Sequence, residues 1–160
     1  MAVRRLPRHL PSVSRLAEEA AAAAGADSLM IKAIIAVESA WKPSAYRYEP
    51  GFWQRYLAAH PDYAGCEPRR VSASYGLMQI MYPTAVDMGY EGEPEGLFSP
   101  SLNLRFGIGF LMTLIAKAGG DAWEAIAAYN GGWGGRKGKD PQAYAVKVRQ
   151  VYDALKEANG

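Results

Sequence analysis

One stretch in the first third of the chain is almost wholly apolar and carries a single acid. Residues 29–41 read as apolar positions interrupted by few polar ones, and Glu38 stands near their end. A helix that is apolar on nearly every face is buried. The pattern therefore predicts a buried helix that Asp27 caps and that Pro43 prevents from continuing. Burial disfavours the charged form of a carboxyl group, so we expect a raised pKa at Glu38.

Helix signals recur along the chain, whereas no stretch alternates convincingly as a strand would. Caps and breakers bound four further helices, at residues 11–25, 99–119, 121–130 and from 140 onward, with Ser12 opening the first and Asp121 capping the third. Shorter helical turns are expected near residues 52–57 and 83–89, and residues 131–135 are rich in glycine and predict a loop. We therefore predict an all-α or nearly all-α fold of about seven helices, with residues 1–160 forming a single domain.

Composition narrows the class of protein. The chain is 49% hydrophobic and 21% charged with a net charge of +2, which is typical of a soluble globular protein. That charge suits an anionic polymer but is too small to indicate nucleic-acid binding. Cys66 is the only cysteine, and with two histidines in the chain we expect no disulfide, metal cluster or cofactor. No apolar run is long enough to span a membrane, and the basic segment 1–9 lacks the apolar core of a recognisable signal peptide.

Four sequence boxes occur in a fixed order around Glu38. They are Val-Glu-Ser-Ala-Trp-Lys-Pro-Ser-Ala at 37–45, Gly-Leu-Met-Gln-Ile-Met-Tyr-Pro-Thr-Ala at 76–85, Leu-Phe-Ser-Pro-Ser-Leu-Asn-Leu-Arg-Phe-Gly at 97–107 and Ala-Tyr-Asn-Gly-Gly at 128–132. In this order they resemble the lytic transglycosylases with a soluble-transglycosylase (SLT) catalytic domain, relatives of the goose-type lysozymes. The resemblance covers residues 26–45 and 72–156 and implies a lysozyme-like fold.

The resemblance implies one catalytic residue. Glu38 would protonate the β-1,4 glycosidic oxygen between N-acetylmuramic acid and N-acetylglucosamine. It would then take a proton from the muramoyl C6 hydroxyl, which closes a 1,6-anhydro ring. Because that nucleophile belongs to the substrate, no second carboxylate is needed, whereas hydrolytic glycosidases normally use a pair.

The resemblance also implies a set of sugar-binding and supporting residues. Substrate binding falls to Gln79, Met81, Tyr129, Asn130 and Tyr144, and the supporting roles fall to Ser39 and Gly76. Some of these residue types have structural alternatives. Gln79 is alternatively a loop-capping amide, Met81 a core residue, and Tyr129 a core residue rather than the phenol that holds Glu38.

Around the substrate-binding residues, three finer expectations follow. Ser39 is expected to make a structural hydrogen bond, and Gly76 to serve a backbone bend close to the substrate. The family serine that precedes the second box aligns equally well with Ser72 and Ser74.

The chain departs from the family pattern between the first two boxes. About 37 residues separate Glu38 from Gly76, roughly twice the usual spacing, and the added segment 46–70 is aromatic. We expect Trp53 or Tyr56 to face the glycan groove; alternatively, the aromatic residues form the core of a small subdomain. The segment also carries Glu49, which would be the second acid of a hydrolytic muramidase.

The expected partner is the glycan strand of peptidoglycan, with no nucleic acid, no membrane span and a monomeric protein. The expected place of action is the bacterial cell wall, in the periplasm or after delivery by a phage or secretion apparatus. A non-catalytic peptidoglycan-binding module is the alternative from another class, but it predicts loss of the glutamate that the first box retains.

Overall fold

The structure, a computed structural model, describes residues 12–159 and is predominantly helical. Five helices make up most of it: α1 (Val13–Ala24), α2 (Ser28–Ser39), α6 (Pro100–Lys117), α7 (Ala122–Gly135) and α8 (Lys139–Ala158). Three short α-helices, α3 (Pro50–Phe52), α4 (Pro68–Val71) and α5 (Tyr82–Asp87), join them, with a π-helix at Trp53–Leu57 and a 3₁₀ helix at Pro94–Phe98. The predicted helical class is confirmed with eight α-helices. The basic segment 1–9, for which the sequence predicts no export signal, lies outside the described residues.

The ends of the long helices follow the predicted caps. The side chains of Ser12 and Asp27 accept hydrogen bonds from the first turns of α1 and α2, and Asp121 does so for α7. Gly25 ends α1 with a φ of 70°, which favours glycine. The predicted loop at 131–135 is wrong: α7 continues to Gly135 across a single break at Gly132.

The sequence also failed to predict a three-stranded antiparallel sheet. Its order is β1 (Tyr46–Tyr48), β2 (Ala73–Tyr75) and β3 (Ile80–Met81), with Tyr46 opposite Tyr75 and Ser74 opposite Met81. The strands are too short to show alternation, and β1 pairs with a segment far along the chain, so no local pattern announces them. Since β1 and β2 flank residues 49–72, they bring both ends of the aromatic insertion together.

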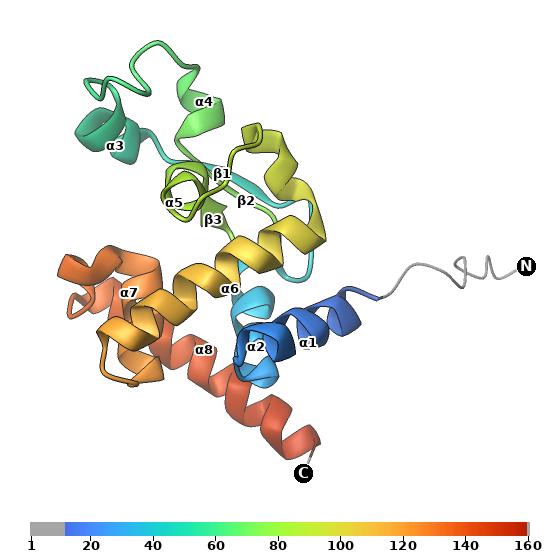
Figure 1. The fold of residues 1–160 in the computed structure, drawn as a ribbon. Helices are drawn as coiled ribbons and strands as arrows, with labels where there is room; N and C mark the ends of the chain where they lie inside the picture. The colour runs from blue at the N-terminus through green and yellow to red at the C-terminus, as the bar shows by residue number, and fades with distance from the viewer. Residues whose placement is uncertain (1–11, 160) are drawn as a thin grey trace, which may run out of the picture.

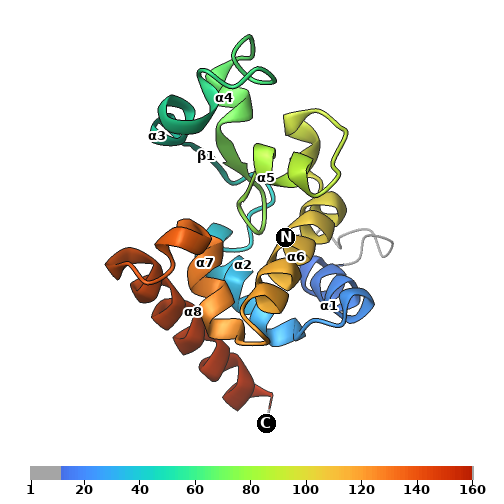
Figure 2. The same cartoon turned by 60° about the vertical axis from the view of Figure 1, so that its left-hand side comes forward.

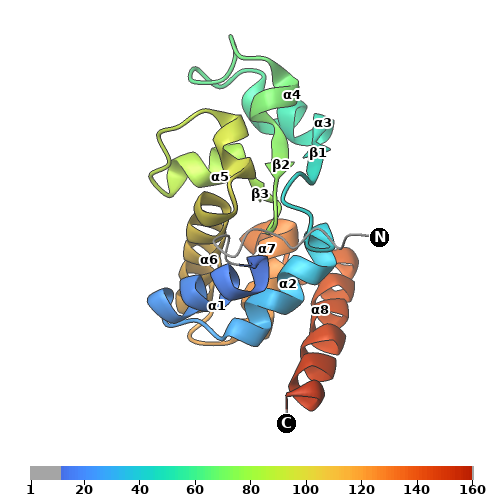
Figure 3. The ribbon, with the colours of Figure 1, turned by 90° about the vertical axis from the view of Figure 1, so that its right-hand side faces the viewer.

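The elements form two lobes that α6 connects. Helices α1, α2, α7 and α8 pack around an apolar core in one lobe, while the sheet, α3, α4 and α5 form the other (Figures 1 and 3). The central helix of the first lobe is α2, whose Ile31, Ile34 and Ile35 are fully buried against the neighbouring helices. This burial holds the end of α2, and Glu38 with it, where the two lobes meet.

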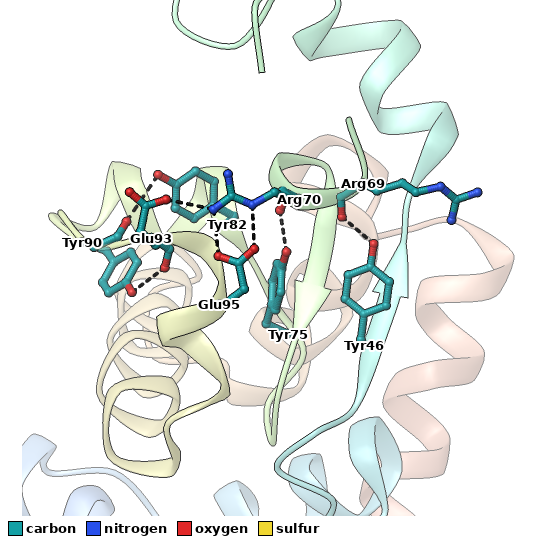
Figure 4. A network of polar contacts seen from close by, with 9 residues as sticks. Tyr46, Arg69, Arg70, Tyr75, Tyr82, Tyr90, Glu93 and Glu95 are labelled. Carbon is teal, nitrogen blue, oxygen red and sulfur yellow. Dashed lines mark hydrogen bonds and ion pairs between the residues drawn. The ribbon is translucent and has the colours of Figure 1, made fainter. Parts of the chain in front are cut away.

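Arg70 ties the far end of the insertion to the body of the second lobe. Its guanidinium donates to Glu95 at 2.6 Å and to Glu93 at 2.9 Å, and its backbone oxygen accepts from the Tyr75 hydroxyl at 2.6 Å (Figure 4). Tyr46 likewise donates from its hydroxyl to the Arg69 carbonyl. Several contacts on one side chain form a network and not an isolated surface pair. The insertion is therefore fixed at α4 as well as at the sheet.

Candidate active site

A cleft of about 1360 Å³ lies where the two lobes meet. Insertion residues line part of it, and α7 and α8 line another part. Figure 2 shows the insertion, with α3 and α4, above α7 and α8. Small-molecule sites usually occupy roughly 300–1,000 Å³, so the cleft has room for a ligand longer than a single sugar. The four predicted residues Glu38, Gln79, Tyr129 and Asn130 all line it.

Glu38 reaches this cleft from the last turn of α2. Burial is the main cause that raises the pKa of its carboxyl group from 4.5 to about 7. The Tyr144 phenol and the charges of Arg47 and Lys147 oppose the rise, while the charge of Glu49 adds to it. A carboxyl with this pKa is about half protonated at neutral pH, so it can serve as an acid and, once ionised, as a base.

The raised pKa makes a prediction for stability. A carboxyl that holds its proton more tightly in the folded chain than in the unfolded chain makes folding less favourable once it ionises. The free energy of unfolding of the wild type should therefore fall as pH rises from about 4.5 to about 7. Glu38→Gln removes that dependence. In urea unfolding, the free energy of unfolding of the variant should increase by about 3 kcal/mol relative to that of the wild type between about pH 4 and about pH 8. A constant difference across this range would contradict the burial of Glu38.

Two tyrosines stand beside Glu38, and they differ in their hydrogen bonds. The Tyr144 hydroxyl of α8 interacts with Glu38 but makes no hydrogen bond of ordinary geometry within residues 12–159, although it is buried. The Tyr129 hydroxyl donates to the Met78 carbonyl at 2.6 Å, so the expectation that this phenol holds Glu38 is wrong. Burial and the nearby charge of Glu38 both raise the pKa of Tyr129. Tyr129 therefore supports the loop of the second box, and Tyr144 is the phenol turned toward the acid.

Gln79 sits in the turn between β2 and β3 with a φ of +50°. Its side-chain nitrogen donates to the Ala45 carbonyl at 3.1 Å and to the Gly76 carbonyl at 3.0 Å, as the loop-capping alternative predicts. The side chain nevertheless lines the cleft. These two bonds hold the amide in place, and its oxygen remains available to accept from a sugar hydroxyl or acetamide.

Gly76 has a φ of +71°, which confirms the predicted backbone bend. A Cβ atom there would lie 2.5 Å from the Asn103 amide nitrogen and 2.8 Å from the Leu97 carbonyl oxygen. The close approach is thus to α6 and the turn before it. Gly76 is buried and is absent from the lining of the cleft, so its expected approach to the substrate stays a prediction.

Asn103 is the important position that sequence reasoning did not single out. It is fully buried, and its side-chain oxygen accepts from the Met78 backbone nitrogen at 2.8 Å. Its nitrogen donates to the carbonyls of Tyr75 at 2.6 Å and Leu97 at 2.8 Å. One amide on α6 therefore fixes the backbone that carries Gln79. The available signal was an amide within the apolar helix segment 102–108, since buried polar groups need partners.

The remaining predicted residues divide between the cleft and its supports. Met81 and Tyr56 line the cleft, and Tyr56 is 55% exposed. Trp53 is half-buried and lies outside the lining. Ser39 donates to the Ile35 carbonyl at 3.1 Å, which is the structural bond expected of it.

Of the two competing serines, only one reaches the cleft. Ser74 contributes to the lining, whereas Ser72 is fully buried and donates to the Glu49 carbonyl at 2.6 Å. Ser72 therefore fastens one end of the insertion and is not exposed to a ligand. The Glu49 side chain lines the cleft, where Arg47 pairs with it at 3.2 Å.

Among residues 12–159, no helix is both long and apolar enough to cross a membrane. In the same range, no three His, Cys, Asp or Glu side chains gather as metal ligands would.

Comparison with known proteins decides the family. The sequence profile of the transglycosylase SLT domain matches residues 15–151. The chain belongs to the transglycosylase SLT domain family. A search of curated protein sequences found no significant match.

Solved structures of this SLT family resemble the fold. An inactive glutamate-to-glutamine mutant of the lytic transglycosylase Slt from Pseudomonas aeruginosa superposes with a TM-score of 0.64 at 21% identity over 86% of the chain. The 70 kDa soluble lytic transglycosylase from Escherichia coli superposes with a TM-score of 0.62 at 23% identity over 88% of the chain. In each case the match spans 23% of the longer protein, so the SLT domain here corresponds to about a quarter of those relatives.

Proposed function

We propose that this SLT domain is a peptidoglycan lytic transglycosylase in which Glu38 is the only acid and base. The observation that carries the proposal is a buried carboxyl, with a pKa raised to about 7, that opens into a cleft lined by amide and aromatic groups. Family membership supports the same activity. The inactive mutant of the Pseudomonas aeruginosa relative has a glutamate replaced by glutamine.

The proposed reaction uses one carboxyl group twice, first as an acid and then as a base. Glu38 gives its proton to the glycosidic oxygen as the bond from that oxygen to muramoyl C1 breaks. The muramoyl C6 hydroxyl oxygen then bonds to C1, and the Glu38 carboxylate takes the hydroxyl proton and returns to its starting state. Attack from within the same sugar has a high effective concentration, about 10⁵ M or more in well-oriented cases. Tyr144 would orient the acid, and Gln79 and Asn130 would hold the sugar acetamido groups.

Product analysis tests the reaction class. Purified peptidoglycan is digested in ¹⁸O-labelled water, and the new muramoyl ends are examined by mass spectrometry. The proposal predicts 1,6-anhydro ends without label, since water takes no part. Reducing ends that carry ¹⁸O would establish the hydrolytic muramidase instead.

Glu49 is the residue that keeps the muramidase alternative open, because it lines the same cleft. Its carboxylate already pairs with Arg47 and so is not free to activate water. Glu49→Gln should therefore leave the anhydro products unchanged in kind. Loss of cleavage together with reducing ends in the wild type would assign it the second catalytic role.

The pKa of Glu38 also predicts a pH profile. The first step needs the protonated acid, so kcat/KM should halve near pH 7 and fall about tenfold for each further pH unit. Below that value the profile should level off, because no second carboxylate has to be charged. Initial rates on soluble glycan strands at constant ionic strength measure this. On strands freed of peptide stems, a second fall on the acid side would indicate a two-carboxylate mechanism.

The insertion supplies an exposed aromatic ring to the cleft, so Tyr56 should stack on a sugar. Stacking on ground and transition states alike changes KM more than kcat. Tyr56→Ala should raise KM about fivefold, as expected for a ring contact worth about 1 kcal/mol. Trp53→Ala is the matched control from the same π-helix, since Trp53 lies outside the cleft; it should lower the melting temperature without raising KM. If Tyr56→Ala instead lowered the melting temperature and left KM unchanged, Tyr56 would be a structural residue of the insertion.

The proposed setting follows from the substrate. Peptidoglycan lies in the bacterial cell wall, and we propose that the domain acts there as a monomer on glycan strands.

A further inference from the structure

The cleft carries more positive charge than its neutral sugars would require. Its acidic and basic side chains are Glu38, Arg47, Glu49, Arg55 and Lys147. Arg47 and Glu49 neutralise each other as an ion pair, and Glu38 is partly protonated at neutral pH. Among the ion pairs within residues 12–159, none includes Arg55 or Lys147, so neither cation has an ion-pair partner there.

The two unpaired cations come from different walls of the cleft. Lys147 lies on α8 one turn after Tyr144, and residues three apart share a helix face. Its charge lowers the pKa of Glu38, and both residues line the cleft. Arg55 comes from the insertion, where its guanidinium lies 5.9 Å from the Tyr56 ring centre. Both cations therefore line the cleft, one from the insertion and one from α8.

We propose that Arg55 and Lys147 bind carboxylates of the peptide stem on the muramoyl residue, so that the enzyme prefers glycan with anionic stems over stem-free glycan. The inference rests on the proposed function. N-acetylated sugars carry no charge, whereas the lactyl group of muramic acid bears a peptide with free carboxylates. Guanidinium and ammonium groups bind carboxylates through charge-assisted hydrogen bonds. Arg55 belongs to the segment that lengthens this chain relative to the family pattern, so the insertion would set substrate preference.

Three forms of one substrate separate the effects of stem and sugar. They are glycan strands freed of phosphate polymers that carry intact stems, the same strands with the stem carboxylates converted to amides, and the same strands after an amidase has removed the stems and the lactyl carboxylates that this exposes have been converted to amides. Wild-type kcat/KM should be highest on the first form and about 20-fold lower on the other two at low ionic strength. Exposed ion pairs contribute up to about 1 kcal/mol each, roughly fivefold. The preference should shrink as salt is added.

The double variant Arg55→Gln/Lys147→Gln tests the assignment. Its ratio of kcat/KM on intact stems to kcat/KM on amidated stems should fall about 20-fold, to near one. Arg69→Gln/Lys139→Gln is the matched control, because these exposed cations come from the same insertion and the same helix but lie outside the cleft lining. It should keep the wild-type ratio. An unchanged ratio in the cleft variant, or equal losses on all three substrates, would overturn the proposal.

A binding measurement separates this inference from the proposed catalysis. Glu38→Gln protein is titrated calorimetrically with a soluble muramoyl tripeptide and with its fully amidated form. The acid form should bind about 20-fold more tightly, and the added Arg55→Gln/Lys147→Gln changes should abolish that difference. Equal binding of both forms would refute stem recognition even if cleavage proceeds as proposed. A wild type that binds the acid form selectively but cleaves no glycan would refute the proposed function alone.

Discussion

Glu38→Gln should reduce cleavage of peptidoglycan by at least about 10²- to 10⁴-fold while leaving the fold intact. The amide has nearly the same size as the acid but cannot transfer a proton to the glycosidic oxygen. Release of soluble muropeptides from purified sacculi, followed by chromatography, measures the loss.

The matched control for Glu38→Gln is Glu91→Gln, an exposed acid outside the cleft, which should retain full turnover. Melting curves and circular dichroism at about pH 5 compare the folds where Glu38 is largely protonated. Near-normal turnover in Glu38→Gln, with matched melting behaviour, would exclude this residue as the catalyst.

Asn103→Ala should destabilise the protein by about 3–5 kcal/mol. The change strands the Met78 nitrogen and the carbonyls of Tyr75 and Leu97 without partners in a fully buried place. Each unsatisfied buried group costs about 1–3 kcal/mol, and a cavity adds to the loss. Urea unfolding gives the free energy, and the melting temperature should fall by about 10 °C. The surviving folded fraction should also lose activity, because the turn that carries Gln79 is no longer fixed.

Asn159→Ala provides the comparison for Asn103→Ala. Its side-chain nitrogen also donates to a backbone carbonyl, that of Leu155 at 2.8 Å, but at an exposed helix end. Water replaces that hydrogen bond on substitution, so the free energy of unfolding should change by no more than about 0.5 kcal/mol. A loss below about 1 kcal/mol for Asn103→Ala would show that the 75–78 backbone holds its place without the amide.

Local signals were sufficient for the long helices. Ser12, Asp27 and Asp121 begin helices as their side chains predict, since a cap depends only on neighbouring backbone groups. The α7 end was misjudged because a glycine run permits a loop but does not require one. The strands escaped notice because each is two or three residues long, and such segments gain their order from a partner strand that sequence neighbours do not reveal.

The candidate site was predictable at the level of residues and less so at the level of bonds. The order of the boxes placed Glu38, Gln79 and Asn130 at one cleft. It could not decide that Tyr129 would donate to Met78, because the choice between two acceptors a few ångströms apart depends on packing. The contributions of Arg47 and Lys147 to the pKa of Glu38 were missed for the same reason, because the positions of side chains around the cleft depend on packing.

The pairing of β1 with β2 makes the aromatic insertion a segment that can be replaced, because it begins and ends at neighbouring positions of the sheet. Tyr48 lies opposite Ala73, and the Glu49 nitrogen donates to the Ser72 carbonyl at 2.8 Å, so the segment leaves and rejoins the sheet at one point. Adjacent antiparallel strands can be joined by a two-residue turn. Residues 49–72 can thus be replaced by a short turn, or by a loop of other composition, while the strand register stays as it is. Chimeric enzymes made at this junction would keep the acid on α2 and change the wall that meets the polymer, together with the contacts that Arg70 makes to Glu93 and Glu95.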